Sequence, residues 1–178
     1  MNRRKLFLIF SMGILAFFGG MAARATAFPA GNSDTVLTAK DIEGKLFPEK
    51  IFYRGQLATT QLRNTGGVRF AGDVYLVAGL CDNGGYAANV KEKFQGYLLS
   101  EVPIEIGGET LKAGAYGFGV VGGQFVVTDL GANDVLKTLA TRDAELKHPT
   151  PLHVAAASQS GAYRLYLGRD YVEFRRAK

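Results

Sequence analysis

The sequence predicts a mainly β protein, either an antiparallel β-sandwich or a small β-barrel with one or two short helices. Short apolar runs alternate with turn signals along most of the chain, and few segments have a helical pattern. Glycine is abundant, with 23 residues, and several glycines occur as adjacent pairs. Such pairs are typical of tight hairpin turns. These features favour one antiparallel domain without internal repeats.

The N-terminus has the pattern of an export signal, which we expect to cover residues 1–27. A basic head at residues 3–5 precedes a largely apolar run at residues 6–18, and small residues follow at the spacing that a signal peptidase recognises. Cleavage after Ala25 and cleavage after Ala27 both fit. The two arginines of the head also match a twin-arginine signal, so both export routes stay open. Only an uncleaved signal would attach the chain to a membrane.

Removal of this signal changes the charge of the protein. The whole chain carries 21 Lys+Arg and 16 Asp+Glu, a formal net charge of +5. Arg3, Arg4, Lys5 and Arg24 lie in the signal, whereas the first acidic residue is Asp34. The mature chain therefore has 17 basic minus 16 acidic residues, or +1. This small charge gives no reason to expect nucleic acid as a partner.

The mature chain is long enough for one domain with a substantial core. Cleavage after Ala27 leaves 178 minus 27, or 151 residues. Cys81 is the only cysteine, so no intramolecular disulfide can form, and its apolar surroundings predict a small buried residue. We expect a flexible leader at residues 28–37 and a single β-rich domain at residues 38–178.

Two helices are expected within this domain. The first covers residues 39–46, with Thr38 as its cap. The second covers residues 134–144, with Asn133 or Asp134 as its cap.

The rest of the domain is expected to form strands, apart from one helical turn at residues 89–94. Pro103 indicates an edge or a bulge in a long, bent strand. The expected strands are residues 50–54, 57–63, 68–70, 74–80, 96–106, 115–121, 124–130, 152–157, 163–167 and 171–174. The expected turns are residues 64–67, 71–73, 82–85, 107–108, 122–123, 158–161 and 168–170.

One hairpin region has a distinctive sequence. Residues 107–118 read Gly-Gly-Glu-Thr-Leu-Lys-Ala-Gly-Ala-Tyr-Gly-Phe. This segment resembles a G-G-x-x-L-x-A-G-x-Y-G motif in a family of exported bacterial proteins of unknown function with β-rich domains. The resemblance extends through the C-terminal half of the mature chain. It implies a β-rich fold and a location in the cell envelope, and it supplies neither an activity nor catalytic residues.

A glycine pattern at residues 117–122 matches the G-x-G-x-x-G of dinucleotide-binding loops. That fingerprint requires a helix directly after the glycines. Residues 124–127 are strand-like instead, so we interpret the glycines as flattening a strand and forming a hairpin turn. No cofactor is expected.

Metal and nucleophile patterns are weak. His148 and His153 are the only histidines, and they flank a Pro-Thr-Pro segment instead of sharing one helix face. The side-chain oxygens of Asp129, Asn133 and Asp134 could bind calcium, but a role as helix cap explains Asn133 or Asp134 more simply. No serine lies in a nucleophile-elbow pattern. We therefore expect no metal site.

Five side chains are candidates for ligand binding: Arg54, Tyr116, Arg142, Asp143 and His153. Arginines beside tyrosines can clamp an anionic or planar ligand, and histidine titrates near neutral pH.

We predict a periplasmic or secreted cell-envelope protein, non-catalytic, that binds a small ligand or an envelope protein. The alternative is an exported, hydrolase-like enzyme with a site made of Arg54, Arg142, Asp143 and His153. A closed cavity would favour a small ligand, and an exposed apolar patch a protein partner. A pocket that gathers three of these four residues would favour the enzyme.

Overall fold

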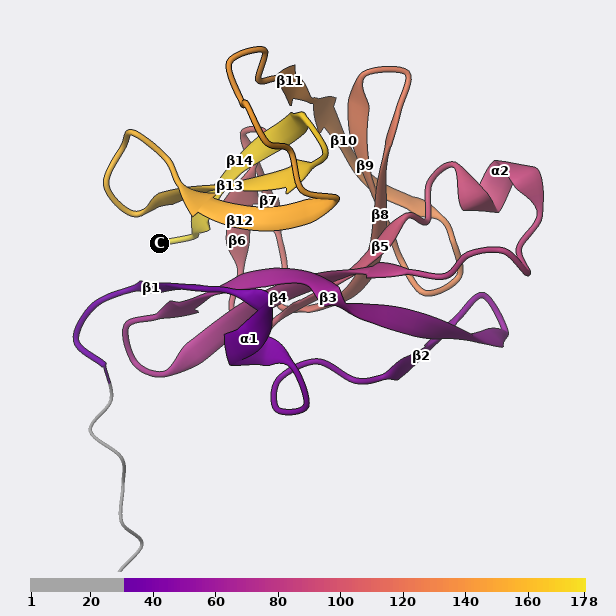
Figure 1. Ribbon diagram of the computed structural model, residues 1–178, viewed down its shortest axis with the longest axis horizontal. Coiled ribbons are helices and arrows are strands. Elements are labelled where there is room, and N and C mark those ends of the chain that lie inside the picture. Colours follow the sequence, from indigo (N-terminus) through magenta and orange to yellow (C-terminus); the bar gives the residue numbers. More distant parts are fainter. Residues whose placement is uncertain (1–30) are drawn as a thin grey trace, which may run out of the picture.

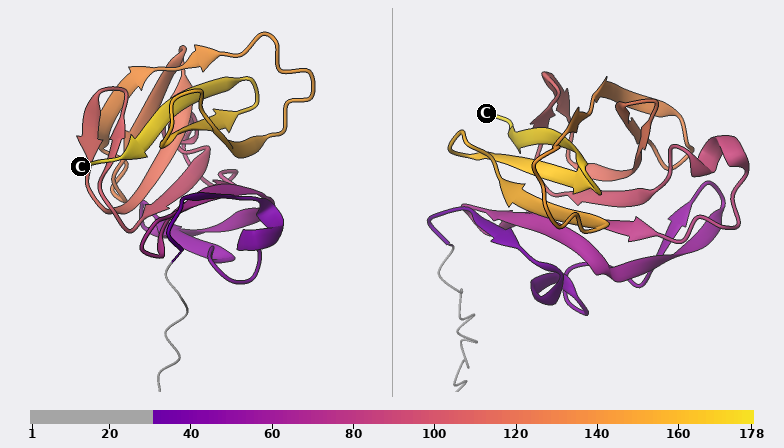
Figure 2. Two further views of the ribbon diagram at one scale, coloured as in Figure 1. Left: turned by 90° about the vertical axis from the view of Figure 1, so that its left-hand side faces the viewer. Right: turned by 45° about the horizontal axis from the view of Figure 1, so that its top comes forward.

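The computed structural model describes residues 31–178, which form two antiparallel β-sheets stacked on each other (Figure 1). Figure 2 shows the C-terminal strands, in orange and yellow, lying over the first sheet. The sheets are open, so the predicted β-sandwich is confirmed and the barrel alternative is not adopted. The predicted signal at residues 1–27 lies outside the described residues. Within residues 31–178, no helix has the length and apolarity that crossing a membrane requires.

The first sheet has eight strands in the order β1-β3-β4-β5-β8-β9-β10, with β2 paired to β3. They are β1 (Thr35–Leu37), β2 (Lys50–Tyr53), β3 (Gln56–Phe70), β4 (Val74–Cys81), β5 (Gly96–Ser100), β8 (Gly114–Val121), β9 (Gln124–Thr128) and β10 (Asp134–Leu139). The predicted turn at Gly122 and Gly123 joins β8 to β9, with φ of 57° and 78°. Glycine accepts such positive φ values without strain.

The second sheet has six strands in the order β12-β13-β14-β6-β7, with β11 paired to β14. They are β6 (Ile104–Ile106), β7 (Glu109–Leu111), β11 (Thr141–Arg142), β12 (Leu152–Ala156), β13 (Ala162–Leu167) and β14 (Asp170–Arg176). The predicted turn at Gly107 and Gly108 joins β6 to β7. The expected long strand at residues 96–106 is divided, because the chain leaves the first sheet after Ser100 and enters the second at Ile104. Pro103 lies at this corner.

The predicted helix at residues 134–144 is wrong. These residues form β10 and β11, and β10 pairs with the edge of β9. Leu136 is buried, whereas Val135 and Lys137 on either side of it are exposed. Such alternation, together with β-branched residues, suits a strand that covers a sheet edge.

The predicted turn at residues 64–67 is also wrong, because β3 continues through it with a register shift between Gln61 and Thr65. The glycines here allow close packing. A Cβ at Gly66 would lie 2.8 Å from the backbone nitrogen of Val154 on β12. The bulge therefore bends β3 where it passes beneath the second sheet.

The N-terminal part of the domain differs from expectation in two places. Residues Thr35–Leu37 of the predicted leader form β1, which pairs with β3. The first helix, α1 (Ala39–Ile42), is shorter than predicted. Its predicted cap is present, because the backbone N–H and the hydroxyl of Thr38 donate to the Asp41 carboxylate at 2.8 and 2.7 Å. The second helix, α2 (Ala88–Lys91), overlaps the predicted helical turn at residues 89–94.

The first sheet is buried on both faces, which explains the almost continuous apolar sequence of β4. Leu76 and Ala78 face the core between the sheets. Val77 and Cys81 face a second core on the opposite side of the sheet. That second core contains Ile42 of α1, Phe47, Ile51 and Tyr53 of the β2 region, and Phe94 after α2.

The glycines of the G-x-G-x-x-G pattern lie where other elements touch this sheet. A Cβ at Gly117 would lie 2.7 Å from the ring of Tyr53, and one at Gly119 would lie 2.9 Å from the carbonyl oxygens of Glu92 and Lys93. Gly122 is in the hairpin turn. The interpretation of these glycines as strand-flattening and turn residues is therefore confirmed.

Cys81 is expected to resist thiol reagents in the folded protein. It is 5% exposed, and burial raises the pKa of its thiol to about 12. Because only the thiolate reacts, we expect modification at pH 8 to be roughly a thousandfold slower than for a free cysteine. Labelling with an aromatic disulfide reagent should be rapid only in denaturant. Rapid, complete labelling of the native protein would contradict this burial.

Candidate functional site

Two of the five predicted ligand-binding residues, Arg54 and Tyr116, serve local structure. Arg54 has a φ of 50° at the β2–β3 turn, and its Nη1 donates to the carbonyl oxygen of Gly131 at 2.7 Å. The Tyr116 hydroxyl on β8 donates to the carbonyl oxygen of Lys112 at 3.1 Å, while its ring packs against the core between the sheets.

Asp143 and His153 do come together, around Tyr166 of the second sheet, and Arg142 precedes Asp143 in the chain. The Tyr166 hydroxyl donates to Asp143 Oδ2 at 3.0 Å. The His153 ring stacks on Tyr166, with 4.4 Å between ring centroids and 8° between the planes. Arg142 forms an ion pair with Asp170 at 3.3 Å, next to this group.

Asp143 and His153 are occupied by contacts that hold the loop between β11 and β12. Asp143 Oδ1 accepts the backbone N–H groups of Glu145 and Leu146, both at 3.1 Å. The Nδ1 atom of His153 lies 2.8 Å from the Thr150 hydroxyl, and burial lowers the pKa of His153, which favours its neutral ring. Asp143 contacts the hydroxyl group of Tyr166 and His153 stacks on its ring, so Tyr166 lies between the two residues. No principal pocket of residues 31–178 is lined by three of the four residues of the enzyme alternative.

The expected helix cap at Asn133 or Asp134 is wrong, because a strand begins at Asp134, and the loop before it is held by Asp129. Asp129 Oδ1 accepts the backbone N–H of Gly131 at 2.8 Å and that of Asn133 at 2.9 Å. Hydrogen bonds from the Asn133 side chain and backbone hold the pKa of the Asp129 carboxyl below its usual value. Asp134 pairs with Lys93 and Lys137, both at 2.7 Å. In the described part of the chain, no three His, Cys, Asp or Glu residues are grouped as a metal site would require.

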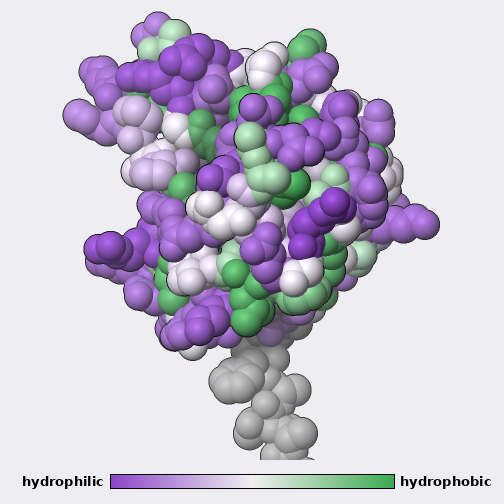
Figure 3. All heavy atoms as spheres, turned by 90° about the vertical axis from the view of Figure 1, so that its right-hand side faces the viewer, coloured by the Kyte–Doolittle hydropathy of each residue, from purple (hydrophilic) through white to green (hydrophobic). Residues whose placement is uncertain are grey.

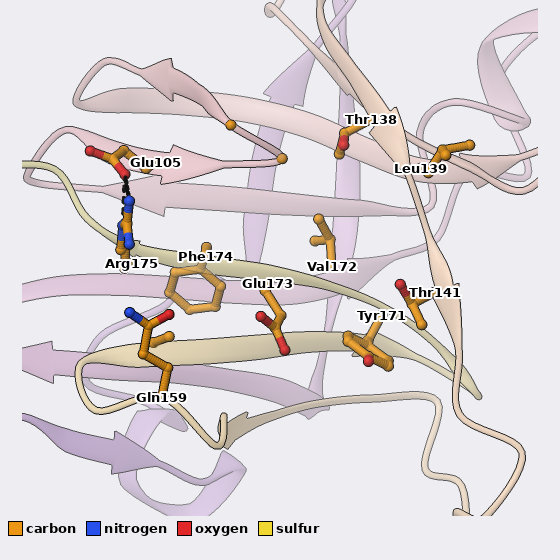
Figure 4. Close-up of a pocket in the computed structure, with 13 residues that line it drawn as sticks. Glu105, Thr138, Leu139, Thr141, Gln159, Tyr171, Val172, Glu173, Phe174 and Arg175 are labelled. Carbon is orange, nitrogen blue, oxygen red and sulfur yellow. Dashed lines mark hydrogen bonds and ion pairs between the residues drawn. The ribbon is translucent and has the colours of Figure 1, made fainter.

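A cleft of about 460 Å³ borders the middle of β14 (Figure 4). This volume is in the range of small-ligand sites. Gly107 and Gly108 of the β6–β7 turn and Leu139 at the end of β10 form part of its wall. Its polar lining consists of Glu105, Thr138, Thr141, Gln159, Tyr171, Glu173 and Arg175.

The cleft exists because the hydrogen-bonding ladder beside β14 is interrupted. On this side of β14, β11 pairs with Asp170 and Tyr171. Further along, β6 pairs with residues 174–176. Val172 and Glu173 have no partner strand between these two segments. The interruption begins where Gly107, with a φ of 60°, turns the chain away after β6.

The backbone of Glu173 points into this interruption. Alternate residues of an antiparallel strand direct both N–H and C=O to the same neighbour. Ala177 N–H donates to the carbonyl oxygen of Pro103 at 2.9 Å, so it points to the β6 side. At the other end, the carbonyl oxygen of Arg169 accepts the N–H of Asp143 at 2.9 Å, which also lies on this side. Glu173 shares their odd-numbered parity and therefore presents a donor and an acceptor to the cleft.

Charged side chains lie along both sides of this backbone segment. Arg175 pairs with Glu105 at 2.5 Å, as Figure 4 shows, and Arg164 pairs with Glu173 at 3.0 Å. The guanidinium carbon of Arg164 also lies 4.5 Å from the centre of the Tyr171 ring. Of the two lining carboxylates, Glu105 pairs with Arg175 of the lining and Glu173 pairs through Oε1 with Arg164 beside it, so Glu173 Oε2 has no hydrogen-bond partner among the described residues. The cleft therefore suits a neutral or cationic ligand better than an anion.

Two other hollows lie outside this cleft. A groove of about 400 Å³ on the outer face of the first sheet is lined mainly by apolar residues, among them Tyr75, Val77, Leu99 and Ala115. A smaller hollow of about 250 Å³ includes His153 and Arg63. The face in Figure 3 carries its apolar residues in separate groups among polar ones. No continuous apolar patch marks a protein interface on that face.

No match to this chain was found among protein-family models, curated proteins or solved structures. The resemblance of residues 107–118 to exported β-rich proteins therefore stays an expectation. No sequence signal pointed to the cleft. The sequence predicts a C-terminal strand of residues 171–174 only and one long strand at residues 96–106, whereas β14 has seven residues and its neighbour β6 has three.

Proposed function

We propose that this chain is an exported cell-envelope protein whose β-rich domain binds a ligand without catalysis, in the cleft beside β14. The interrupted ladder at Val172 and Glu173 carries this proposal. Backbone groups that lack a strand partner need hydrogen bonds from water or from a ligand. In a cleft of about 460 Å³, they provide fixed polar contacts on a rigid strand.

The side chains around Glu173 support binding of a polar molecule. Hydroxyl groups of Thr138, Thr141 and Tyr171 can each donate and accept. The ion pair of Arg175 with Glu105 fixes one end of the cleft. The positions of these groups are set by strands of both sheets, so little ordering is required when a ligand binds.

The enzyme alternative has less support. Arg54 lies at the β2–β3 turn, away from the second-sheet group of Arg142, Asp143 and His153, and each of these residues is engaged in a structural contact. The cleft, in turn, is lined by none of the four.

The proposal is tested by native mass spectrometry of the mature protein isolated from its own cell envelope. We expect an additional bound mass on the wild type, and loss of most of it in Thr141→Trp, because an indole at this exposed position would fill the cleft. Thr59→Trp is the matched control, because Thr59 is also exposed on a strand but does not line the cleft. It should retain the bound mass.

The same spectra test export. A polypeptide mass that begins at residue 26 or 28 is expected from cleavage after Ala25 or Ala27. An unprocessed chain would contradict the proposed processing. A bound mass that is equally abundant on Thr141→Trp would place the ligand outside this cleft.

A further inference from the structure

We infer that the ligand of this cleft is a short extended peptide that adds the missing piece of strand between β11 and β6. This inference rests on the proposed function and specifies its ligand. β11 and β6 lie on the same side of β14, and both run antiparallel to it. A peptide that enters between them in the same direction would complete one continuous ladder.

The register fixes the length of the peptide segment. Thr141 lies opposite Tyr171, and Ile106 lies opposite Phe174. Only the positions opposite Val172 and Glu173 are open, so two peptide residues fit into the ladder. At about 3.4 Å per residue, they span roughly 7 Å.

The backbone of Glu173 fixes how the peptide is held. The peptide residue opposite Glu173 would donate its N–H to the carbonyl oxygen of Glu173 and accept the N–H of Glu173 with its own carbonyl. This is the hydrogen-bonded type of antiparallel pair. A ligand without an amide N–H at this position would lose one of the two bonds.

The cleft also specifies the side chains. Directly opposite residues of an antiparallel pair place their side chains on the same face of the sheet. The residue opposite Glu173 would therefore lie beside its carboxylate, which is 49% exposed. Arg164 bonds Oε1 of this carboxylate and leaves Oε2 without a partner among the described residues, so a lysine or arginine fits there. The next residue lies opposite Val172, which is buried in the core between the sheets, and a small apolar side chain fits at that position.

The test is an NMR titration of the ¹⁵N-labelled mature protein with acetyl-Lys-Val-amide. We expect saturable shifts centred on the backbone amide of Glu173 with a Kd in the millimolar range, because this probe supplies only the two ladder residues of the peptide that co-isolates with the protein. Methylation of the lysine backbone nitrogen should weaken binding about tenfold, because one hydrogen bond is lost. Acetyl-Glu-Val-amide should bind about threefold more weakly than the lysine peptide.

Variants separate the charge contribution from the backbone contribution. Glu173→Gln should reduce the preference for lysine while retaining the effect of N-methylation. Glu109→Gln is the matched control, since Glu109 is exposed on β7 and does not line the cleft. Glu109→Gln should change neither the preference for lysine nor the effect of N-methylation. Equal binding of the methylated and unmethylated peptides, or no shift at Glu173 up to millimolar peptide, would overturn the inference. If Thr141→Trp still removes the co-isolated mass, the binding site stands and only its peptide ligand is rejected.

Discussion

Replacement of Phe118 with alanine is expected to lower the free energy of unfolding by about 3–5 kcal/mol. Phe118 is fully buried on β8 and stacks on Phe125 with 5.4 Å between ring centroids. Its ring also fills the space above Gly96, where a Cβ would lie 2.5 Å from the ring edge. Because Phe118 belongs to the close-packed core between the sheets, the cavity left by alanine cannot close easily.

Equilibrium unfolding in denaturant, followed by circular dichroism, measures this loss. Phe52→Ala provides the matched control, because Phe52 lies on β2 with 58% of its surface exposed. Its expected change is below about 1 kcal/mol. A similar decrease in the free energy of unfolding for both variants would contradict the burial of Phe118 in the core.

The substitution Gly119→Ala, which adds a single methyl group, is expected to destabilise the fold by about 1–3 kcal/mol. The alanine Cβ would lie 2.9 Å from the carbonyl oxygens of Glu92 and Lys93, which belong to the backbone and cannot rotate away. The segment after α2 would have to move off the sheet, and Phe94, which is fully buried in the second core, would move with it.

The control for this substitution is Gly84→Ala. Gly84 has no heavy atom within 4 Å of an added Cβ, so its expected change is within about 0.5 kcal/mol. Thermal or chemical unfolding of the two variants gives the comparison. A neutral Gly119→Ala would contradict the assignment of this glycine to close packing.

Local sequence alone predicted the hairpins whose turns are formed by a pair of glycines. The pairs at residues 107–108 and 122–123 predicted the β6–β7 and β8–β9 hairpins. The closing strands β12 to β14 were likewise recognisable from short apolar segments between polar turns.

Local sequence failed where long-range packing decided the structure. Residues 134–144 contain good helix formers, but the free edge of β9 binds them as β10. Gly66 and Gly67 look like a turn, yet they serve the close approach of neighbouring strands, since a Cβ at Gly67 would lie 2.4 Å from the carbonyl oxygen of Leu76. Neither contact is encoded within the segment itself.

The candidate site was less predictable than the fold. Sequence reasoning selected titratable side chains such as Arg142 and His153, because their chemistry is visible in the residue type. The cleft depends instead on backbone register among β6, β11 and β14, which are distant along the chain. Glu173 can be recognised as part of the site only when the structure shows that its backbone N–H and C=O face the cleft without a partner strand.

Hydrogen exchange at the amide of Glu173 tests the interrupted ladder most directly. In the ligand-free mature protein, NMR-detected exchange of Glu173 should be at least about 100-fold faster than that of Val172 and Phe174, whose backbone groups face β13. Binding of the lysine peptide should slow it. Protection of Glu173 equal to that of its two neighbours, without any ligand, would contradict the open ladder on which the binding site depends.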